Sequence, residues 1–508
     1  MLKDKIYVKG SEKMGLFKKF KNNKLFNKMK VGVKAMQSVD KNNGYVGLDE
    51  EILYLVKQFR NSKERKMMIE GMRYYEIDND ILYADTDKDK TSNADNRLCH
   101  PFFKNMVDEK VQYLLEKDVT LNCEDETYLE KLKKVVDRDY LQSILVKLGY
   151  QASICGKAWL HPYIKDNELK FMVIPAYECK PIWVDNSHEE LKAMIRVYED
   201  VRWNGSSMQR YENVEVWTPE GVTYYTVTDN SLVLDYGRTY ENNEPVNHYK
   251  EDGVWTSWGR VPFICFKNNW RELNDLKPIK SLIDGYDSSR SEAANYIEDI
   301  NNIIYVLRGY EGESLSNFIS NLKKYRAIKI DDDEGGVDTL NSNADIKAYK
   351  EHYESLKADI IELGQGVSKD KDRIGNSPSG IALKFLYSGL DLKGNSLESR
   401  FKDGFKELLY FINYFMSKSN LGVYDSKNTK VSLVFNRDMK VNESETIDCC
   451  NNSKGIISDK TIRQHHPWVN DAEEEEEQIK KEQDEQGTSV NLFNKVQNVK
   501  VGSGMNEE

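Results

Sequence analysis

The sequence is most informative about the fold at residues 278–310, PIKSLIDGYDSSRSEAANYIEDINNIIYVLRGY. Along this stretch the spacing of the apolar residues changes from that of a helix to that of a strand. Apolar residues first recur at the spacing of one helix face, at Ile279, Leu282, Ile283, Tyr286, Ala293, Ile297, Ile300 and Ile304. Pro278 suits the first turn of this helix, where no backbone N–H is needed. The run IIYVLRGY that follows predicts a strand. We therefore expect a helix of about 25 residues, roughly 37 Å long, that leads into a β element.

A second apolar seam lies further along the chain. Its members alternate at spacings of three and four residues, with charged residues between them, at Ile346, Tyr349, Tyr353, Leu356, Ile360 and Leu363. This spacing predicts a second long helix. Between the two helices lie the strand-like runs IIYVLRGY and YRAIKID, and a turn at residues 333–336. We expect the two helices to pack side by side, with the small β insertion at their far end.

A β-rich region precedes both helices. Five strand-like runs occur between residues 157 and 266, namely KAWLHPYI, ELKFMVI, AMIRVYEDV, ENVEVWT and GVTYYTVT. Turn-forming pairs separate the runs, such as Asp166–Asn167, Asn204–Gly205 and Glu220–Gly221. This pattern predicts an antiparallel meander.

Helical patterns occur on both sides of this region. Before it they cover residues 48–71, 105–117 and 127–156. After the second long helix they begin near residue 379, resume at 396–420, and end at 443–464 with a break at Gly455; VSLVF, residues 431–435, predicts one more strand. A chain of 508 residues with separate runs of helices and strands predicts an α+β fold of more than one domain.

Charge is distributed unevenly along the chain. The net charge is -11, but residues 1–34 hold eleven lysines against two acids, a local net of +9, and residues 471–486 hold nine acids against two lysines, a local net of −7. The acidic total excludes general nucleic-acid affinity of the kind that basic domains show. Apolar runs are too short to span a membrane and no signal-peptide core is present, so we expect a soluble, intracellular protein without a membrane partner.

The sequence offers no catalytic, cofactor or metal residues. A phosphate-binding P-loop is absent, and GNSPSG at residues 375–380 has the wrong spacing for a nucleophile elbow. The series Asp85, Asp87, Asp89 begins like a calcium loop, but Lys90 and Asn96 stand where that loop needs Gly and Glu. Seven scattered cysteines without a C-x-x-C pair argue against a disulfide framework and against a zinc ribbon.

A mixed-charge loop follows the second long helix. In SKDKDRIGNSPSG the cations alternate with acids, as Lys369, Asp370, Lys371, Asp372 and Arg373. Such a loop is typical of solvated surface. It also suits a channel wall that touches a moving phosphate backbone weakly, because each cation adds sequence-independent attraction and the acids keep the total small.

Residues 261–310 as a whole closely resemble the portal proteins of long-tailed phages that infect Gram-positive bacteria. The matching positions are Pro262, Asn268, Asn269, Leu282, Ile283, Asp284, Tyr286, Ser291, Asn295, Gly309 and Tyr310. Three further stretches agree with the family in the same order, at residues 174–199, 377–401 and 431–479. The resemblance extends from about residue 102 to residue 478, and leaves the basic N-terminal arm and the residues after 486 uncovered.

The resemblance implies a portal fold with named parts. They are a basic N-terminal arm at 1–48, a β-rich wing at 49–276, a first stem helix at 277–302, a small α/β clip at 303–342, a second stem helix at 343–365, a tunnel loop at 366–378, a tunnel helix with a returning wing segment at 379–442, a helical crown at 443–470 and an acidic, partly disordered tail at 471–508. Family members form closed rings, commonly of about twelve subunits, with head-to-tail interfaces.

The resemblance also implies partners and a place of action. Portal rings sit at one vertex of the virion capsid, assemble in the host cytoplasm, and conduct double-stranded DNA without reading its sequence. Their protein partners are the terminase motor, the head-tail adaptor, the scaffold and the major capsid protein. The portal itself is not an enzyme and needs no cofactor.

Three sets of site residues follow from this resemblance. Residues 369–373 of the tunnel loop would face the DNA. The candidates for the channel-lining face of the first stem helix are Asp284, Asp287, Arg290 and Glu298. The clip residues that would face the motor and later the adaptor are Arg308, Tyr310, Lys323 and Lys324.

One alternative belongs to a different class of protein. The long helices could form a coiled-coil scaffold or interaction protein of the virion that has no DNA channel. Such a protein would be a small oligomer without a central hole. A hydrolase is disfavoured because no acid–base or nucleophile set is visible.

Overall fold

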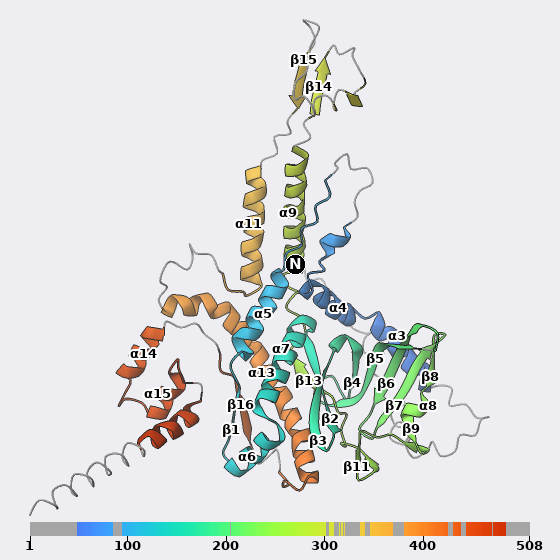
Figure 1. Cartoon of the computed structure of the whole chain (residues 1–508), viewed down its shortest axis with the longest axis vertical. Helices are drawn as coiled ribbons and strands as arrows, with labels where there is room; N and C mark the ends of the chain where they lie inside the picture. The colour runs from blue at the N-terminus through green and yellow to red at the C-terminus, as the bar shows by residue number, and fades with distance from the viewer. Residues whose placement is uncertain are drawn as a thin grey trace, which may run out of the picture.

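The computed structural model describes residues 48–84, 94–203, 205–300, 304–308, 314, 316–317, 320, 336–340, 346–368, 380–424, 430–437, 443–469 and 471–483. Two long helices project together from a body that combines helices and sheets (Figure 1). The predicted α+β class is confirmed. No helix among the described residues is both long and apolar enough to cross a membrane.

Helices form the first part of the body. They are α3 (Leu48–Arg60), α4 (Lys63–Tyr75), the short η1 (Asp80–Tyr83), α5 (Phe102–Leu115), α6 (Glu126–Val135) and α7 (Arg138–Cys155). Two of the predicted helices are each split in two. The side chain of Ser62 accepts a hydrogen bond from the backbone N–H of Arg65, and Asp137 accepts one from Tyr140, so each begins a new helix. The predictions of single helices at 48–71 and 127–156 were therefore wrong.

The strand-like region forms two main antiparallel sheets. One has the order β13-β2-β3, from Ile264–Lys267, Lys157–Lys165 and Glu168–Ile174. The other has the order β4-β5-β6-β7-β8, from Cys179–Trp183, Leu191–Trp203, Met208–Trp217, Val222–Thr228 and Ser231–Leu234. Asp166 and Asn167 have φ values of 54° and 62°, the conformation of a two-residue hairpin turn. The predicted meander is confirmed.

Small elements flank the second sheet in the chain. The short η2 (Ala176–Glu178) lies between β3 and β4. After β8 come α8 (Tyr236–Thr239), the pair β9 (Tyr240–Glu241) and β10 (Glu244–Pro245), and the pair β11 (Tyr249–Glu251) and β12 (Val254–Thr256).

The two projecting helices are α9 (Lys280–Ile300) and α11 (Ile346–Leu363), and both match the predicted seams. They lie side by side, and the two-stranded sheet of β14 (Ile304–Arg308) and β15 (Gly336–Leu340) lies beyond their far ends (Figure 1). The strand partner of β14 is GVDTL, which the sequence did not single out, and the predicted strand YRAIKID falls outside the described residues.

A single helix of 39 residues, α13 (Gly380–Lys418), replaces the two that the sequence predicts around residues 379–392 and 396–420. One buried stripe runs through the expected break and contains Leu390, Leu397, Phe401, Phe405 and Leu408. Continuous burial of this stripe outweighs the cost of the interior glycines, about 1 kcal/mol each.

The last part of the chain adds one strand and more helices. The predicted strand β16 (Val431–Val434) pairs with β1 (Thr120–Cys123), a strand that the sequence did not reveal. The helices α14 (Glu443–Asn452) and α15 (Asp459–His465) lie on either side of the break at Gly455, whose φ is 84°, as predicted. A further helical segment covers residues 472–483.

Candidate functional site

The paired helices meet through aromatic side chains. The rings of Tyr296 and Tyr349 stack with centroids 6.5 Å apart, and Tyr286 meets Tyr353 edge-on at 6.2 Å. The guanidinium of Arg290 lies 4.5 Å from the centre of the Tyr353 ring. These contacts hold α9 and α11 together with large, rigid side chains that keep polar atoms at their edges.

Side chains of α9 and α11 are buried only along the part of each helix that is nearest the body. Ser291 is the last buried residue of α9, and Ile360 is the only buried residue of α11 among the side chains that the structure describes. The outer half of each helix therefore has no core of its own in a single subunit. Exposed helix faces of this length are typical of surfaces that contact another chain or line a solvent-filled space.

Asp287, one of the channel-lining candidates, is in fact an interior residue. Its side chain is 0% exposed, and its two carboxylate oxygens lie 2.6 Å from Nδ2 of Asn79 and 2.7 Å from Nδ1 of His100. Burial raises the pKa of Asp287, although the hydrogen bonds from Asn79 and His100 partly offset this. The structure corrects the expectation for Asp287, because residues of the same chain cover its carboxylate completely.

The other three candidates also contact their own chain. Asp284 accepts hydrogen bonds from the Tyr74 hydroxyl and, at 2.8 Å, from Nζ of Lys280. Arg290 lies against Tyr353, as described above. Glu298 is exposed and accepts a hydrogen bond of 2.8 Å from Nδ2 of Asn96. None of these contacts tests whether the three residues line a channel.

The predicted tunnel-loop residues 369–373 lie outside the described residues, but the chain just before them is held firmly. Nζ of Lys393 in α13 donates to the carbonyl oxygen of Gly364 at 2.9 Å. The backbone N–H of Val367 donates to Glu109 in α5 at 3.1 Å. The end of α11 is therefore fixed to the body immediately before the predicted loop.

The predicted clip residues are only partly described. Arg308 is the last residue of β14, opposite Gly336 of β15, and its side chain is outside the described set. Tyr310, Lys323 and Lys324 are outside it altogether.

A buried ion pair below the long helices was not predicted. Nζ of Lys110 in α5 lies 2.5 Å from Oδ1 of Asn268 and 2.9 Å from Oδ2 of Asp275, and Lys393 approaches the same carboxylate at 3.6 Å. Burial lowers the pKa of Lys110 to about 8. Lys110 lies three residues after Val107, on the apolar face of α5. A charge at such a position is the sequence signal that could have revealed this cluster.

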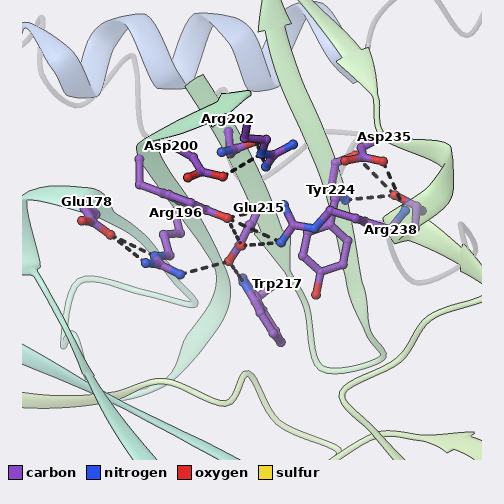
Figure 2. A network of polar contacts seen from close by, with 12 residues as sticks. Glu178, Arg196, Asp200, Arg202, Glu215, Trp217, Tyr224, Asp235 and Arg238 are labelled. Carbon is purple, nitrogen blue, oxygen red and sulfur yellow. Dashed lines mark hydrogen bonds and ion pairs between the residues drawn. The ribbon is translucent and has the colours of Figure 1, made fainter. Parts of the chain in front are cut away.

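A second unpredicted network lies in the five-stranded sheet. Glu215 is buried between two arginines, with Arg238 at 3.2 Å and Arg196 at 3.6 Å, and accepts a hydrogen bond of 3.1 Å from the indole of Trp217 (Figure 2). Arg196 also pairs with Glu178 at 3.0 Å. Because one carboxylate is shared by donors from β5, β6 and α8, the network fixes the sheet and α8 together rather than forming an open site. Within the described residues, no group of three or more His, Cys, Asp and Glu side chains could hold a metal ion.

Comparisons with known proteins agree with this architecture. A family model described as "Phage portal protein, SPP1 Gp6-like" matches residues 56–489. The portal protein of Clostridium phage phiCD119 is 34% identical over 452 residues, which cover 85% of this chain and 95% of that protein. The portal protein of Bacillus phage SPP1 is 30% identical over 442 residues, covering 84% of this chain and 86% of that one.

Solved structures that resemble this chain include one titled "Virion of native gene transfer agent (GTA) particle", with a TM-score of 0.38 at 10% identity, covering 72% of this chain and 89% of that one. The match to the family model and the two relatives, each over most of the chain, shows that this chain belongs to the phage portal protein family.

Proposed function

We propose that this portal protein forms a closed ring around a channel at the capsid vertex, through which double-stranded DNA is packaged, retained and later ejected. The observation that carries the proposal is the projecting pair α9 and α11, in which no described side chain is buried beyond Ser291 of α9 or before Ile360 of α11. In a closed ring of about twelve copies, each such pair would gain a neighbour on one flank and face the channel on another.

Each part of the chain has a role in this proposal. Helices α9 and α11 form the stem, and residues 303–342, which include β14 and β15, form the clip. Residues 49–276 form most of the wing, residues 366–378 the tunnel loop, and residues 443–470 the crown. The tunnel helix occupies the first part of 379–442, which is the start of α13 in this structure.

We assign the proposed partners to different parts of the chain. The clip, with Arg308, Tyr310, Lys323 and Lys324, meets the terminase motor during packaging and the head-tail adaptor afterwards. The body meets the scaffold and the major capsid protein during assembly in the host cytoplasm. The portal performs no chemistry in this scheme, because the motor supplies the ATP hydrolysis that moves the DNA.

The tunnel loop is the proposed contact with DNA. Lys369, Lys371 and Arg373 would each attract phosphate without regard to sequence, while Asp370 and Asp372 limit the total attraction. DNA could then move past the loop without being held still.

Neutralising these cations tests the tunnel-loop assignment. We expect the triple variant Lys369→Gln, Lys371→Gln, Arg373→Gln to form normal rings but to package or retain less DNA, measured as nuclease-protected DNA per particle. The matched control removes three exposed cations of the body, Lys165→Gln, Arg210→Gln and Lys406→Gln. Loss of rings in the tunnel-loop variant, or an equal packaging defect in the control, would contradict the assignment.

The coiled-coil scaffold without a channel is the second candidate. The aromatic seam between α9 and α11 is compatible with such a protein. The two candidates differ in oligomeric state, because a scaffold of this kind has no central hole.

A further inference from the structure

A short non-helical segment, residues 94–100, runs along α9. It precedes α5 and lies next to the lower part of α9 (Figure 1). The backbone N–H of Asn96 donates to Oδ1 of Asn295 at 2.6 Å, and the backbone N–H of Leu98 donates to Oγ of Ser291 at 2.9 Å. We call residues 94–100 the strap.

The spacing of these contacts fits an extended chain, the strap, that runs along a helix, α9. Strap residues 96, 98 and 100 alternate, while their partners on α9, residues 295, 291 and 287, are four apart and run in the opposite direction. Two residues of extended chain advance about 6.6 Å, and four residues of helix advance about 6 Å. Each second strap residue therefore meets the next turn of α9, over three consecutive turns.

A buried cluster closes the lower end of the strap. Nδ1 of His100 lies 2.7 Å from Oδ1 of Asp287, and Nδ2 of Asn79 donates to the other carboxylate oxygen at 2.6 Å. The ring of Tyr286 meets the His100 ring edge-on, with centroids 4.8 Å apart. Removing either polar partner would leave one oxygen of the buried carboxylate without its hydrogen bond, which is costly for a buried charged group.

The strap and α11 together leave one polar face of α9 open. The strap covers the face that contains Asp287, Ser291 and Asn295, and α11 covers the face with Tyr286 and Tyr296. Separations of seven and four residues place Ser281, Ser288 and Glu292 on a third face. Ser281 and Glu292 are exposed, and the hydroxyl of Ser288 donates to the carboxylate of Glu292 at 3.1 Å.

We propose that the strap fixes the rotation of α9 about its own axis, and that the face with Ser281, Ser288 and Glu292 is the one that α9 presents to the channel. The channel part of this inference rests on the proposed ring. Ile297 follows Tyr286 by eleven residues and Arg290 by seven, so it lies on the α11 side of α9. It is apolar and 53% exposed, and therefore suits contact with protein rather than with a wet channel that holds DNA. The strap makes Asp287 unavailable to DNA, and Glu292 is an exposed acid of the open face.

The strap is tested first by hydrogen exchange on the full-length protein. Ser291→Ala with Asn295→Ala removes two strap acceptors, yet alanine favours helix more than serine or asparagine does. We expect α9 amides to exchange about tenfold faster, with β2 and β3 unchanged. Ser355→Ala, on the exposed face of α11, is the matched control and should leave exchange unchanged. Unchanged exchange in α9 of the double variant would overturn the strap.

A second pair of variants tests the lower cluster in case the double variant does not fold. His100→Ala should loosen α9, and His100→Asn should restore much of the protection, because an asparagine amide can occupy the place of Nδ1. Equal exchange in His100→Ala and the parent protein would contradict the cluster's role. These exchange measurements do not need a ring, so failure of the strap and failure of the proposed function can be told apart.

The channel face is tested in DNA-filled particles. A photo-crosslinking amino acid, benzoylphenylalanine, is placed at position 292 on the open face, or at position 298 beside the strap. We expect crosslinks to packaged DNA several-fold more often from position 292. Equal or stronger crosslinking from position 298, or none from either position in filled particles, would overturn the assignment of the face.

Discussion

Buried histidines make the stability of this protein sensitive to mild acid. Nδ1 of His161 lies 2.7 Å from the carbonyl oxygen of Pro262. His248 uses both ring nitrogens, since Nε2 lies 2.9 Å from the Thr218 carbonyl oxygen and Nδ1 accepts the Trp258 N–H at 3.1 Å. An imidazole that accepts a hydrogen bond has to be neutral at that nitrogen. Burial lowers the pKa of both histidines to about 4.

The free energy of unfolding should therefore fall as the pH falls from about 6.5 to about 4. In that window the unfolded chain binds protons at these two histidines and the folded chain does not, which costs roughly 2 kcal/mol per histidine. Denaturant unfolding at a series of pH values measures this slope. His161→Phe should flatten it, whereas His352→Gln, which removes an exposed histidine of α11, should not. An identical slope in His161→Phe would contradict the argument.

At the scale of single residues, the sequence did not show which residues divide one predicted helix into two. Ser62 and Asp137 are ordinary helix-capping residues, but the apolar periodicity continues past each of them, so a pattern of hydrophobic positions predicts one helix instead of two. The partners of Asp287 were also beyond prediction. Asn79 and His100 are about two hundred residues away in the chain, and only the fold brings them to α9.

At the scale of elements, α13 depends on one glycine for its packing. A side chain at Gly404 would put its Cβ 2.8 Å from the ring of Phe266, which itself meets Phe401 edge-on at 5.2 Å. At Gly394 of the same helix, the nearest atom to such a Cβ is in Tyr113 at an ordinary 3.8 Å. The helix can therefore accept alanine at one glycine and not at the other.

The two glycine variants should change stability in opposite directions. Gly394→Ala should raise the free energy of unfolding by up to about 1 kcal/mol, because alanine favours helix over glycine. Gly404→Ala should lower it by about 1–3 kcal/mol, because the added methyl group overpacks the core against Phe266. Thermal unfolding of both variants measures the difference. A stabilising Gly404→Ala would show that α13 and β13 pack differently.

Helices and strands could be predicted from the sequence where a single hydrophobic period continued along the whole segment. The apolar seams correctly predicted the helices α9 and α11 and their side-by-side packing, and the turn pair Asp166–Asn167 correctly predicted a hairpin. The sequence failed where packing overrode local signals, as in α13, whose buried stripe continues through the interval between the two predicted helices. It also failed for β1, a strand of four residues that exists only because β16 pairs with it.

At the scale of the whole molecule, the subunit has a long exposed projection that is difficult to explain for an isolated monomer. The sheet of β14 and β15 lies at the far end of α9 and α11, and no described side chain is buried beyond Ser291 of α9 or before Ile360 of α11. The chain belongs to the portal family. In the ring that we propose, these exposed surfaces would contact neighbouring copies of the chain. The family itself could be recognised from the sequence, since four stretches matched in order, whereas the side of α9 that we propose faces the channel could not. That side depends on the strap and on α11, which lie far from α9 in sequence.

Electron cryo-microscopy of the purified full-length protein, with its native mass determined by light scattering on the same sample, distinguishes a ring with a channel from a small oligomer. We expect a closed ring with a central hole, of about 700 kDa for about twelve copies of the 59.0 kDa chain. In that ring, α9 and α11 should surround the hole, and Glu292 should face it. A discrete dimer or trimer without a hole would contradict the channel and favour the coiled-coil scaffold instead.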